Sequence, residues 1–138
     1  MFMKPLCITE QDHRSLQVLI DASREQPNGQ RRYSDALQSE ITRARIVDGS
    51  SVPRDVVTMN SRVRLRDLDT GETEVYTLVY PRMADPGENR ISILAPVGTA
   101  ILGCSIGDVI EWPVPAGVRR LLVDDILYQP EKAGDAAL

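Results

Sequence analysis

Residues 61–80 read SRVRLRDLDTGETEVYTLVY, and this stretch decides the fold class of the chain. Apolar and charged residues alternate on both sides of a turn centred on Thr70-Gly71, which is the pattern of a β-hairpin with one buried face. Matching the apolar residues across the hairpin specifies a register, because a one-residue slip would turn every buried side chain to the other face. The register that we expect pairs Val63 with Leu78 and Leu65 with Tyr76.

Further strand patterns follow the hairpin along the chain. A third strand begins at Ile91, and residues 108–112 and 118–128 form a fourth and a fifth around a Pro-Ala-Gly turn. Residues 98–103 (GTAILG) have the pattern of a short helix that ends at a glycine. A mostly antiparallel sheet with one short helix lying on it predicts an α+β fold.

The first fifty residues have helical spacing instead. Thr9 is a suitable N-cap for a helix with apolar residues at Leu16 and Ile20, and the sequence Gln-Pro-Asn-Gly at 26–29 demands a turn. A second apolar stripe, at a spacing of three or four, comprises Tyr33, Leu37, Ile41 and Ala44. We therefore expect a short antiparallel helical hairpin, an arm of roughly 25 Å at 1.5 Å per residue.

Composition limits the partners of the chain. Of its 138 residues, 42% are hydrophobic and 26% are charged, which is typical of a folded domain rather than a disordered segment. The net charge of −4 disfavours autonomous, sequence-specific nucleic-acid binding, because a protein that neutralises phosphates needs an excess of basic residues. No apolar run approaches the roughly 20 residues of a membrane span, and the N-terminus turns polar too early for a secretory signal, so we expect a cytoplasmic protein without membrane contacts.

The residues of common catalytic and metal sites are scarce. The chain has one histidine, His13, and two cysteines, Cys7 and Cys104, which are far apart in the sequence. They are too few for a zinc site of the usual kind without carboxylates, and neither a nucleophile elbow nor a glycine-rich phosphate loop is present. We expect no catalytic residue, no bound metal and no cofactor, and hence a protein that is not an enzyme.

Several separated motifs resemble one family. They occur in order and comprise Val57-Thr58-Met59-Asn60-Ser61, Leu78-Val79-Tyr80-Pro81, Ala95-Pro96-Val97-Gly98, Gly107-Asp108 and Tyr128-Gln129-Pro130-Glu131. In these segments the chain is similar to the C-terminal domain of the Gre transcript-cleavage factors. Over essentially its whole length it resembles the Rnk branch of that superfamily, the regulators of nucleoside diphosphate kinase, in which the helical hairpin is also abbreviated.

The resemblance implies both the organisation and the partner of the protein. It implies a short helical-hairpin, coiled-coil-like arm over residues 1–50 and an FKBP-like domain of the Gre C-terminal type over residues 51–138. It also implies binding to bacterial RNA polymerase at the rim of the secondary channel, and we expect a monomer. The partner contacts carried over from the family are Ala95, Pro96, Val97 and Gly98, with Pro96 and Val97 first; Ala95 stands where the Gre factors commonly have serine.

The tip of the arm differs from that of the cleavage factors. There, the resemblance implies, a pair of acidic residues helps to hold a second magnesium ion, since a hard cation prefers anionic oxygen ligands. Residues 24–33 of this chain read REQPNGQRRY and contain a single acid, so we expect a protein that occupies the channel without stimulating cleavage. The tip residues that we single out are Glu25, Asn28, Gly29, Arg31 and Arg32.

Charged residues of the arm have alternative interpretations. Asp21 and Glu25 share a helix face and could act as a displaced acidic pair, but a solvated face is the simpler interpretation. Arg31 and Arg32 could contact an acidic polymerase surface or RNA phosphates, or they could be ordinary solvated charges.

An arginine stripe also runs along the first strand of the hairpin. Arg62, Arg64 and Arg66 alternate with apolar residues, so we expect them on the solvent face of the sheet. Glu72 and Glu74 on the neighbouring strand are expected to balance part of their charge. A nucleic-acid surface is less favoured there, because the chain is acidic overall and poor in aromatic residues that could stack on bases.

These features together predict a transcription regulator that is not catalytic. It would compete with Gre factors for RNA polymerase, and an effect on nucleoside diphosphate kinase levels would be indirect. The alternatives are an active transcript-cleavage factor, a prolyl isomerase suggested by the fold alone, and an interaction module with another partner. An aromatic content of 4% hardly supplies the aromatic cluster of an isomerase pocket.

Overall fold

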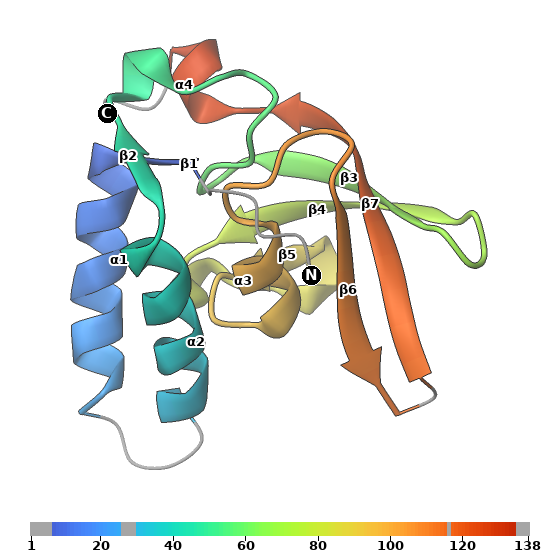
Figure 1. The fold of residues 1–138 in the computed structure, drawn as a ribbon, viewed down its shortest axis with the longest axis horizontal. Coiled ribbons are helices and arrows are strands. Elements are labelled where there is room, and N and C mark those ends of the chain that lie inside the picture. The colour runs from blue at the N-terminus through green and yellow to red at the C-terminus, as the bar shows by residue number, and fades with distance from the viewer. Residues whose placement is uncertain (1–6, 26–29, 116, 135–138) are drawn as a thin grey trace.

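A pair of N-terminal helices lies beside a curled five-stranded sheet in the computed structural model (Figure 1). The structure describes residues 7–25, 30–115 and 117–134, with the backbone alone for residues 30–32 and 112–114. In chain order the helices and strands are β1 (Cys7–Thr9), α1 (Glu10–Ser23), α2 (Gln30–Thr42), β2 (Arg45–Val47), β3 (Arg62–Asp67), β4 (Thr73–Val79), β5 (Arg90–Ser92), α3 (Pro96–Ile101), β6 (Val109–Val114), β7 (Gly117–Tyr128) and α4 (Pro130–Ala133).

The strand order of the large sheet is β5-β4-β3-β7-β6. All neighbouring strands are antiparallel except β5, which runs parallel to β4. The sheet curls around α3, which lies between the N-terminal helices and β6 (Figure 1). The prediction of an α+β fold with a helical N-terminus and a mostly antiparallel sheet is therefore confirmed.

The predicted register of the hairpin is wrong by two residues. Val63 lies opposite Tyr76, and Leu65 lies opposite Glu74. The cause is the Asp67 side chain, whose Oδ1 accepts hydrogen bonds from the backbone N–H groups of Asp69 and Thr70 at 2.8 and 3.2 Å. These bonds centre the turn one residue earlier than expected. A shift of two residues keeps every side chain on its expected face but changes its neighbour across the strands.

The two N-terminal helices are antiparallel. Thr9 caps α1 as predicted, because its Oγ1 accepts a hydrogen bond from the backbone N–H of Asp12 at 3.1 Å. The side-chain amides of Gln17 and Gln38 bond across the pair at 2.8 and 3.2 Å. Towards the C-terminal end of α1, Arg24 Nη2 lies 3.7 Å from Asp35 Oδ1. Residues later in α1 therefore contact residues earlier in α2, which is the order of an antiparallel pair. At the other end the parallel strands β1 and β2 hold the pair together, a feature that sequence reasoning missed.

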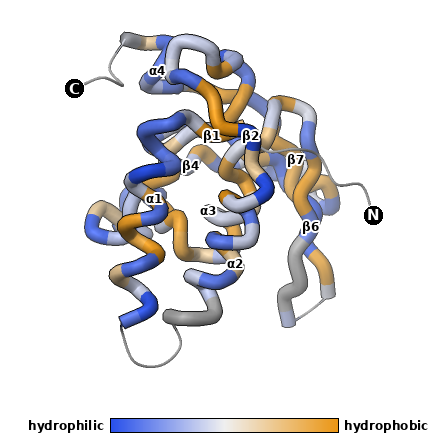
Figure 2. Tube along the Cα trace, turned by 60° about the vertical axis from the view of Figure 1, so that its left-hand side comes forward, coloured by the Kyte–Doolittle hydropathy of each residue, from blue (hydrophilic) through white to orange (hydrophobic). Residues whose placement is uncertain are grey.

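The helices share one apolar core with the sheet. Leu16 and Ile20 of α1 and Leu37 of α2 are fully buried, in the same cluster as Val63 and Leu78 of the sheet. Figure 2 shows hydrophobic segments alternating with hydrophilic ones along α1, as expected of a helix that covers a core with one face. Along this length the helices therefore bury apolar side chains against the sheet as well as against each other. The division into separate domains at residue 50 stays a prediction.

Asp12 links α1 to the sheet by a buried hydrogen bond. Its carboxylate Oδ2 accepts from the backbone N–H of Met59 at 3.1 Å, and only 9% of the residue is exposed. Burial raises the pKa of Asp12 to about 6, an effect that the Met59 bond opposes and the nearby Glu131 carboxylate reinforces. Glu131 is itself held by the Thr58 hydroxyl, which donates to its Oε1 at 2.6 Å. Two neighbouring acids, the buried Asp12 and the half-buried Glu131, thus lie where the helices meet the sheet.

We predict that Asp12 makes the folded chain less stable as the pH rises from about 4 to 6. The folded pKa of about 6 lies above the unfolded value, so the folded state binds the extra proton in this window and loses that advantage above it. The contribution of Asp12 to the free energy of unfolding should fall by roughly 2 kcal/mol across the window. Urea unfolding at several pH values measures it. Asp12→Asn should abolish most of this slope because an amide does not titrate in this range, while its oxygen can still accept the Met59 bond.

Asp21→Asn is the matched control, since Asp21 is an exposed acid on the same helix. It should leave the slope between pH 4 and 6 unchanged. A wild-type slope that survives in Asp12→Asn would assign the pH dependence to other groups.

Candidate functional site

The four residues predicted to contact a partner form the start of α3. The helix begins at Pro96, two residues earlier than predicted, with Ala95 as its N-cap. Pro96 is exposed, Ala95 and Val97 are half-buried, and Gly98 is buried. Pro96 therefore presents its ring to solvent at the first helical position. A backbone N–H at this position has no partner within the helix, so proline loses no helical hydrogen bond there.

Close packing against β5 explains why the chain turns here. A Cβ on Gly98 would lie 2.2 Å from the carbonyl oxygen of Ser92, so only glycine allows α3 to approach this closely. The Thr99 hydroxyl donates to the Ile93 carbonyl oxygen at 2.6 Å, and the Ser92 hydroxyl accepts from the Leu94 N–H at 3.0 Å. Gly98 thus holds the turn in shape, and Pro96 and Val97 form its outer surface.

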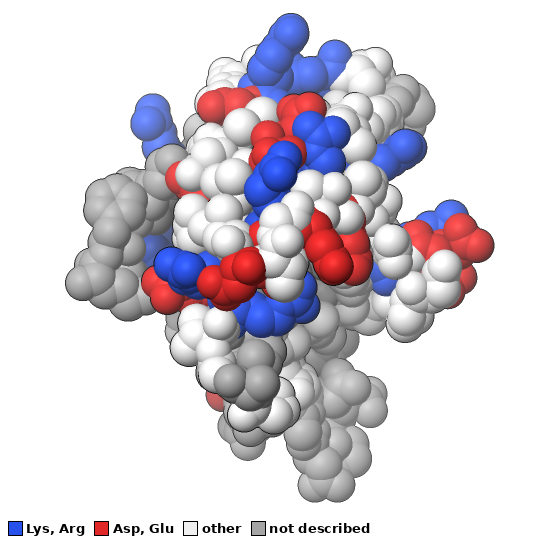
Figure 3. All heavy atoms as spheres, turned by 90° about the vertical axis from the view of Figure 1, so that its right-hand side faces the viewer, with Lys and Arg blue, Asp and Glu red and all other residues white. Residues whose placement is uncertain are grey.

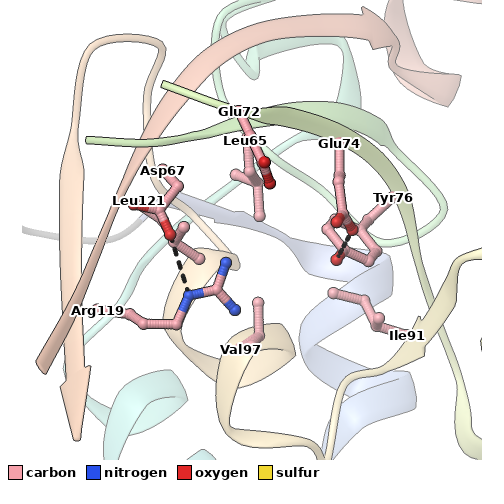
Figure 4. A pocket seen from close by; sticks show the side chains of 9 residues that line it. All are labelled: Leu65, Asp67, Glu72, Glu74, Tyr76, Ile91, Val97, Arg119 and Leu121. Atoms are coloured by element: carbon pink, nitrogen blue, oxygen red, sulfur yellow. Dashed lines mark hydrogen bonds and ion pairs between the residues drawn. The ribbon is translucent and has the colours of Figure 1, made fainter. Parts of the chain in front are cut away.

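A cavity of about 130 Å³ opens beside Val97, on the concave face of the sheet (Figure 4). We refer to it as the sheet–helix pocket. Its walls come from strands β3, β4, β5 and β7, the β3–β4 turn and helix α3. The lining residues are Leu65, Asp67, Glu72, Glu74, Tyr76, Ile91, Val97, Arg119 and Leu121.

The sheet–helix pocket has an apolar base and a charged edge. Arg119 Nε donates to Asp67 Oδ2 at 3.3 Å, and the Tyr76 hydroxyl donates to Glu74 Oε2 (Figure 4). Burial, reinforced by the hydrogen bond to Glu74, raises the pKa of Tyr76 to about 12, so its hydroxyl stays protonated. The pKa of Asp67 is lowered, first by the hydrogen bond from the Asp69 N–H and also by Arg119. Asp67 is therefore an anionic acceptor for Arg119.

The expectation that Glu72 and Glu74 balance part of the charge of the arginine stripe is wrong. Arg64 and Arg66 instead pair with Asp124 of β7, with Nε to carboxylate distances of 2.6 and 3.4 Å. Glu74 lies opposite Leu65 and so points to the concave face, away from the arginines. On the face drawn in Figure 3, basic and acidic side chains are intermixed, with no gathering of one sign. This arrangement is typical of solvated ion pairs rather than of a phosphate-binding surface.

The predicted tip residues are only partly described. Glu25 is exposed just after α1, and the backbone of Arg31 and Arg32 forms the first turn of α2. Asn28 and Gly29 lie outside the described residues. The described tip residues thus lie on other elements than the turn at α3.

The described part of the chain contains no group of three or more His, Cys, Asp or Glu side chains that could hold a metal ion. Asp21, one of the possible displaced acids, accepts a hydrogen bond from Gln17 at 3.1 Å. None of the helices within the described ranges is long and apolar enough to cross a bilayer.

Sequence reasoning missed the polar edge of the sheet–helix pocket. Its acids are Asp67, Glu72 and Glu74, and its base is Arg119. One signal could have found Glu74, which stands two residues before Tyr76 and four before Leu78, on the strand face expected to be buried. A carboxylate at the end of such a face marks the place where the core opens to solvent.

Two families match this chain, one after the other. The family described as "Transcription elongation factor, GreA/GreB, C-term" matches residues 52–128, and the family "Rnk N-terminus" matches residues 4–47. The regulator of nucleoside diphosphate kinase of Escherichia coli is 48% identical over 106 residues, which cover 76% of this chain and 78% of that protein.

A more distant relative and a solved structure are also similar to this chain. A transcription elongation factor GreA of Clostridium botulinum is 40% identical over 90 residues, which cover 65% of this chain and 56% of that protein. The structure of a prokaryotic transcription elongation factor GreA/GreB from Nitrosomonas europaea superimposes with a TM-score of 0.75 at 40% identity, and covers 91% of this chain and 100% of that chain.

We predict that Gly98→Ala distorts the turn at α3. The new Cβ would meet backbone atoms of Ser92 that cannot rotate away, and overpacking of this kind costs about 1–3 kcal/mol of unfolding free energy. Gly49→Ala is the control, because its Cβ would have only an ordinary contact at 3.7 Å. Thermal unfolding of the two variants measures the difference, and equal stability would show that α3 is not held by this close approach.

Proposed function

The chain belongs to the GreA/GreB family of transcription elongation factors, in the branch that carries an Rnk N-terminus, and on that premise we propose that it is a transcription regulator that binds bacterial RNA polymerase. The proposed contact is the rim of the secondary channel, through residues 95–98. The protein acts as a cytoplasmic monomer and is not an enzyme. Any influence on nucleoside diphosphate kinase levels is then indirect, through transcription.

One observation carries the proposed contact. Pro96 is exposed and Val97 half-exposed on a turn that Gly98 and Thr99 fix from below. A rigid apolar projection loses little conformational entropy on binding, which favours it as an anchor for a partner. The turn also lies within the segment that matches the GreA/GreB C-terminal family, whereas the N-terminal helices match a different family.

The proposed lack of cleavage activity follows from the tip of the helical pair. A second magnesium ion at a polymerase active site needs carboxylate ligands, since oxygen anions are what a hard cation binds. The sequence from 24 to 33 offers one acid, Glu25, among three arginines. In this proposal the helices fill the channel and block a Gre factor, but residues 24–33 bring no acidic pair to the metal site.

We also propose that residues 51–138 form an FKBP-like domain and residues 1–50 a short arm. The curled sheet with α3 against its concave side supports the first part (Figure 1). The fold alone does not carry isomerase activity to this chain. The concave face here ends in a small pocket edged by carboxylates, and Tyr76 is the one aromatic residue among the described residues that line it. A prolyl isomerase is therefore the weaker candidate, and a peptide isomerisation assay tests it.

The proposed function predicts competition without catalysis. On backtracked elongation complexes in magnesium buffer, the protein should slow the transcript cleavage that a Gre factor stimulates and should cause no shortening of its own. Gel analysis of labelled transcripts measures both effects. Rapid shortening by the protein alone would make it an active cleavage factor, and an absence of competition at saturating concentrations would contradict a shared binding site.

We predict that Val97→Ala weakens polymerase binding by about fivefold, which corresponds to roughly 1 kcal/mol of contact energy. Val118→Ala is the matched control, because Val118 of β7 is 55% exposed and lies outside both the turn at residues 95–98 and the N-terminal helices. Titration of immobilised polymerase gives the affinities, and the unfolding temperature of each variant reports its folding. Equal affinities of the two variants would remove Val97 from the contact.

A further inference from the structure

A second hollow of the surface, about 590 Å³ in volume, runs along helix α1, and we refer to it as the helix groove. One wall is the segment 80–82, directly after β4. The other wall consists of four residues of one helix face, three, four and seven positions apart: Ser15, Val18, Leu19 and Ala22. The groove shares no lining residue with the turn at 95–98 or with the sheet–helix pocket, so it is a separate surface.

The face of α1 in the groove is apolar and yet open to solvent. Val18 is 70% exposed, the highest value among the large hydrophobic residues in the described part of the chain, and Ala22 is exposed as well. Helix α1 lies on the outer side of the helical pair (Figure 1), with α2 packed against another of its faces. Covering the apolar stripe with a partner would remove its surface from water, which favours binding.

The shape of the helix groove fits a helix better than a small molecule. Small ligands usually bury 70–90% of their surface in a pocket. Here Ser15, Val18 and Arg82 are all exposed, so a small guest would remain largely in water. From Ser15 to Ala22 the wall extends over about 10 Å, which is two helical turns. A stripe with this spacing is the surface against which the apolar face of a second helix packs.

One positive charge stands without a counter-charge in the wall. Arg82 is the single charged residue that lines the groove, and it forms no ion pair with another described residue. Burial raises the pKa of Tyr80 to about 12, so the neighbouring hydroxyl is uncharged. Arg14 and Asp21, one turn to either side of Val18, have opposite signs and add no net charge. The groove is therefore complementary to an apolar surface that carries a carboxylate.

The groove needs both of the segments that match a family. Helix α1 lies within residues 4–47, which match the Rnk N-terminus, and the segment 80–82 lies within residues 52–128, which match the GreA/GreB C-terminal family. Neither segment forms both walls by itself. The groove can therefore bind a partner that the GreA/GreB segment alone does not.

We propose that the helix groove binds an amphipathic helix of a partner protein, with its apolar face on Val18 and Ala22 and an aspartate or glutamate on Arg82. This inference does not rest on the proposed function, because it uses none of residues 95–98.

Two synthetic peptides of about 15 residues, stapled as helices on their far side, test the chemistry. Both carry leucines three, four and seven positions apart, flanked by glutamates in one peptide and by lysines in the other. Titrations followed by the Val18 methyl resonances give the affinities, and the glutamate peptide should bind about fivefold more tightly. The net charge of −4 works against this order, so a preference for glutamate reports the local charge of the groove.

In Arg82→Glu the preference between the peptides should reverse. Arg54→Glu is the matched control, because Arg54 is also exposed but lies outside the groove, and it should keep the preference for glutamate. Equal affinities for the two peptides, or a preference that survives Arg82→Glu, would overturn the proposal.

A cross-linking experiment in cells tests the occupant. Val18→p-benzoylphenylalanine places a photoreactive group in the groove at a position that is too exposed to affect folding. Mass spectrometry of the cross-linked segment should identify a helix of another protein with an acid beside its apolar face, and adding Arg82→Glu should lower the yield severalfold. A cross-link to a second copy of this chain, or a yield that Arg82→Glu leaves unchanged, would overturn the proposal.

Discussion

One apolar cluster joins the N-terminal helices to the sheet, and the placement of the other elements depends on it. Helices of 14 and 13 residues are marginal in water by themselves. Here the fully buried Leu16, Ile20 and Leu37 pack into the cluster that also holds Val63 and Leu78. Each such side chain contributes about 1.5–3 kcal/mol on burial. The same packing brings Asp12 to Met59, so a titratable group lies at the junction of helices and sheet.

The candidate site is built on the outer side of this core. Ile93 and Ile101, at the two ends of the segment 93–101 that contains the turn at α3, are fully buried in the core cluster and so hold this segment in place. Gly98 permits the close approach to Ser92, and Val97 is left at the surface beside the pocket. The pocket exists because the apolar face of β3 and β4 continues past the part that α3 covers. Side chains at that end must meet solvent, which is where glutamates replace aliphatic residues.

Membership of the GreA/GreB family assigns different roles to the two parts of the chain. The segment 52–128 is shared with transcription elongation factors, while 4–47 matches a separate N-terminal family. In the proposed function, docking belongs to the shared segment and the lack of cleavage activity to the helices.

The sequence by itself determined the local elements, because each depends on residues close together in the chain. The Thr9 cap, the alternation of Val63 and Leu65 and the ordered family motifs all lie in single segments, and each led to a correct element or family. Only the tertiary structure decided the register at Glu74, the pairing of Arg64 with Asp124 and the union of helices and sheet in one core. The ion pair and the shared core depend on groups that are distant in sequence, whereas the register goes with a local turn in which the Asp67 carboxylate accepts bonds from the Asp69 and Thr70 N–H groups. The pocket is a product of the same long-range pairing, because its walls come from four strands and a helix whose order along the sheet no local pattern specifies.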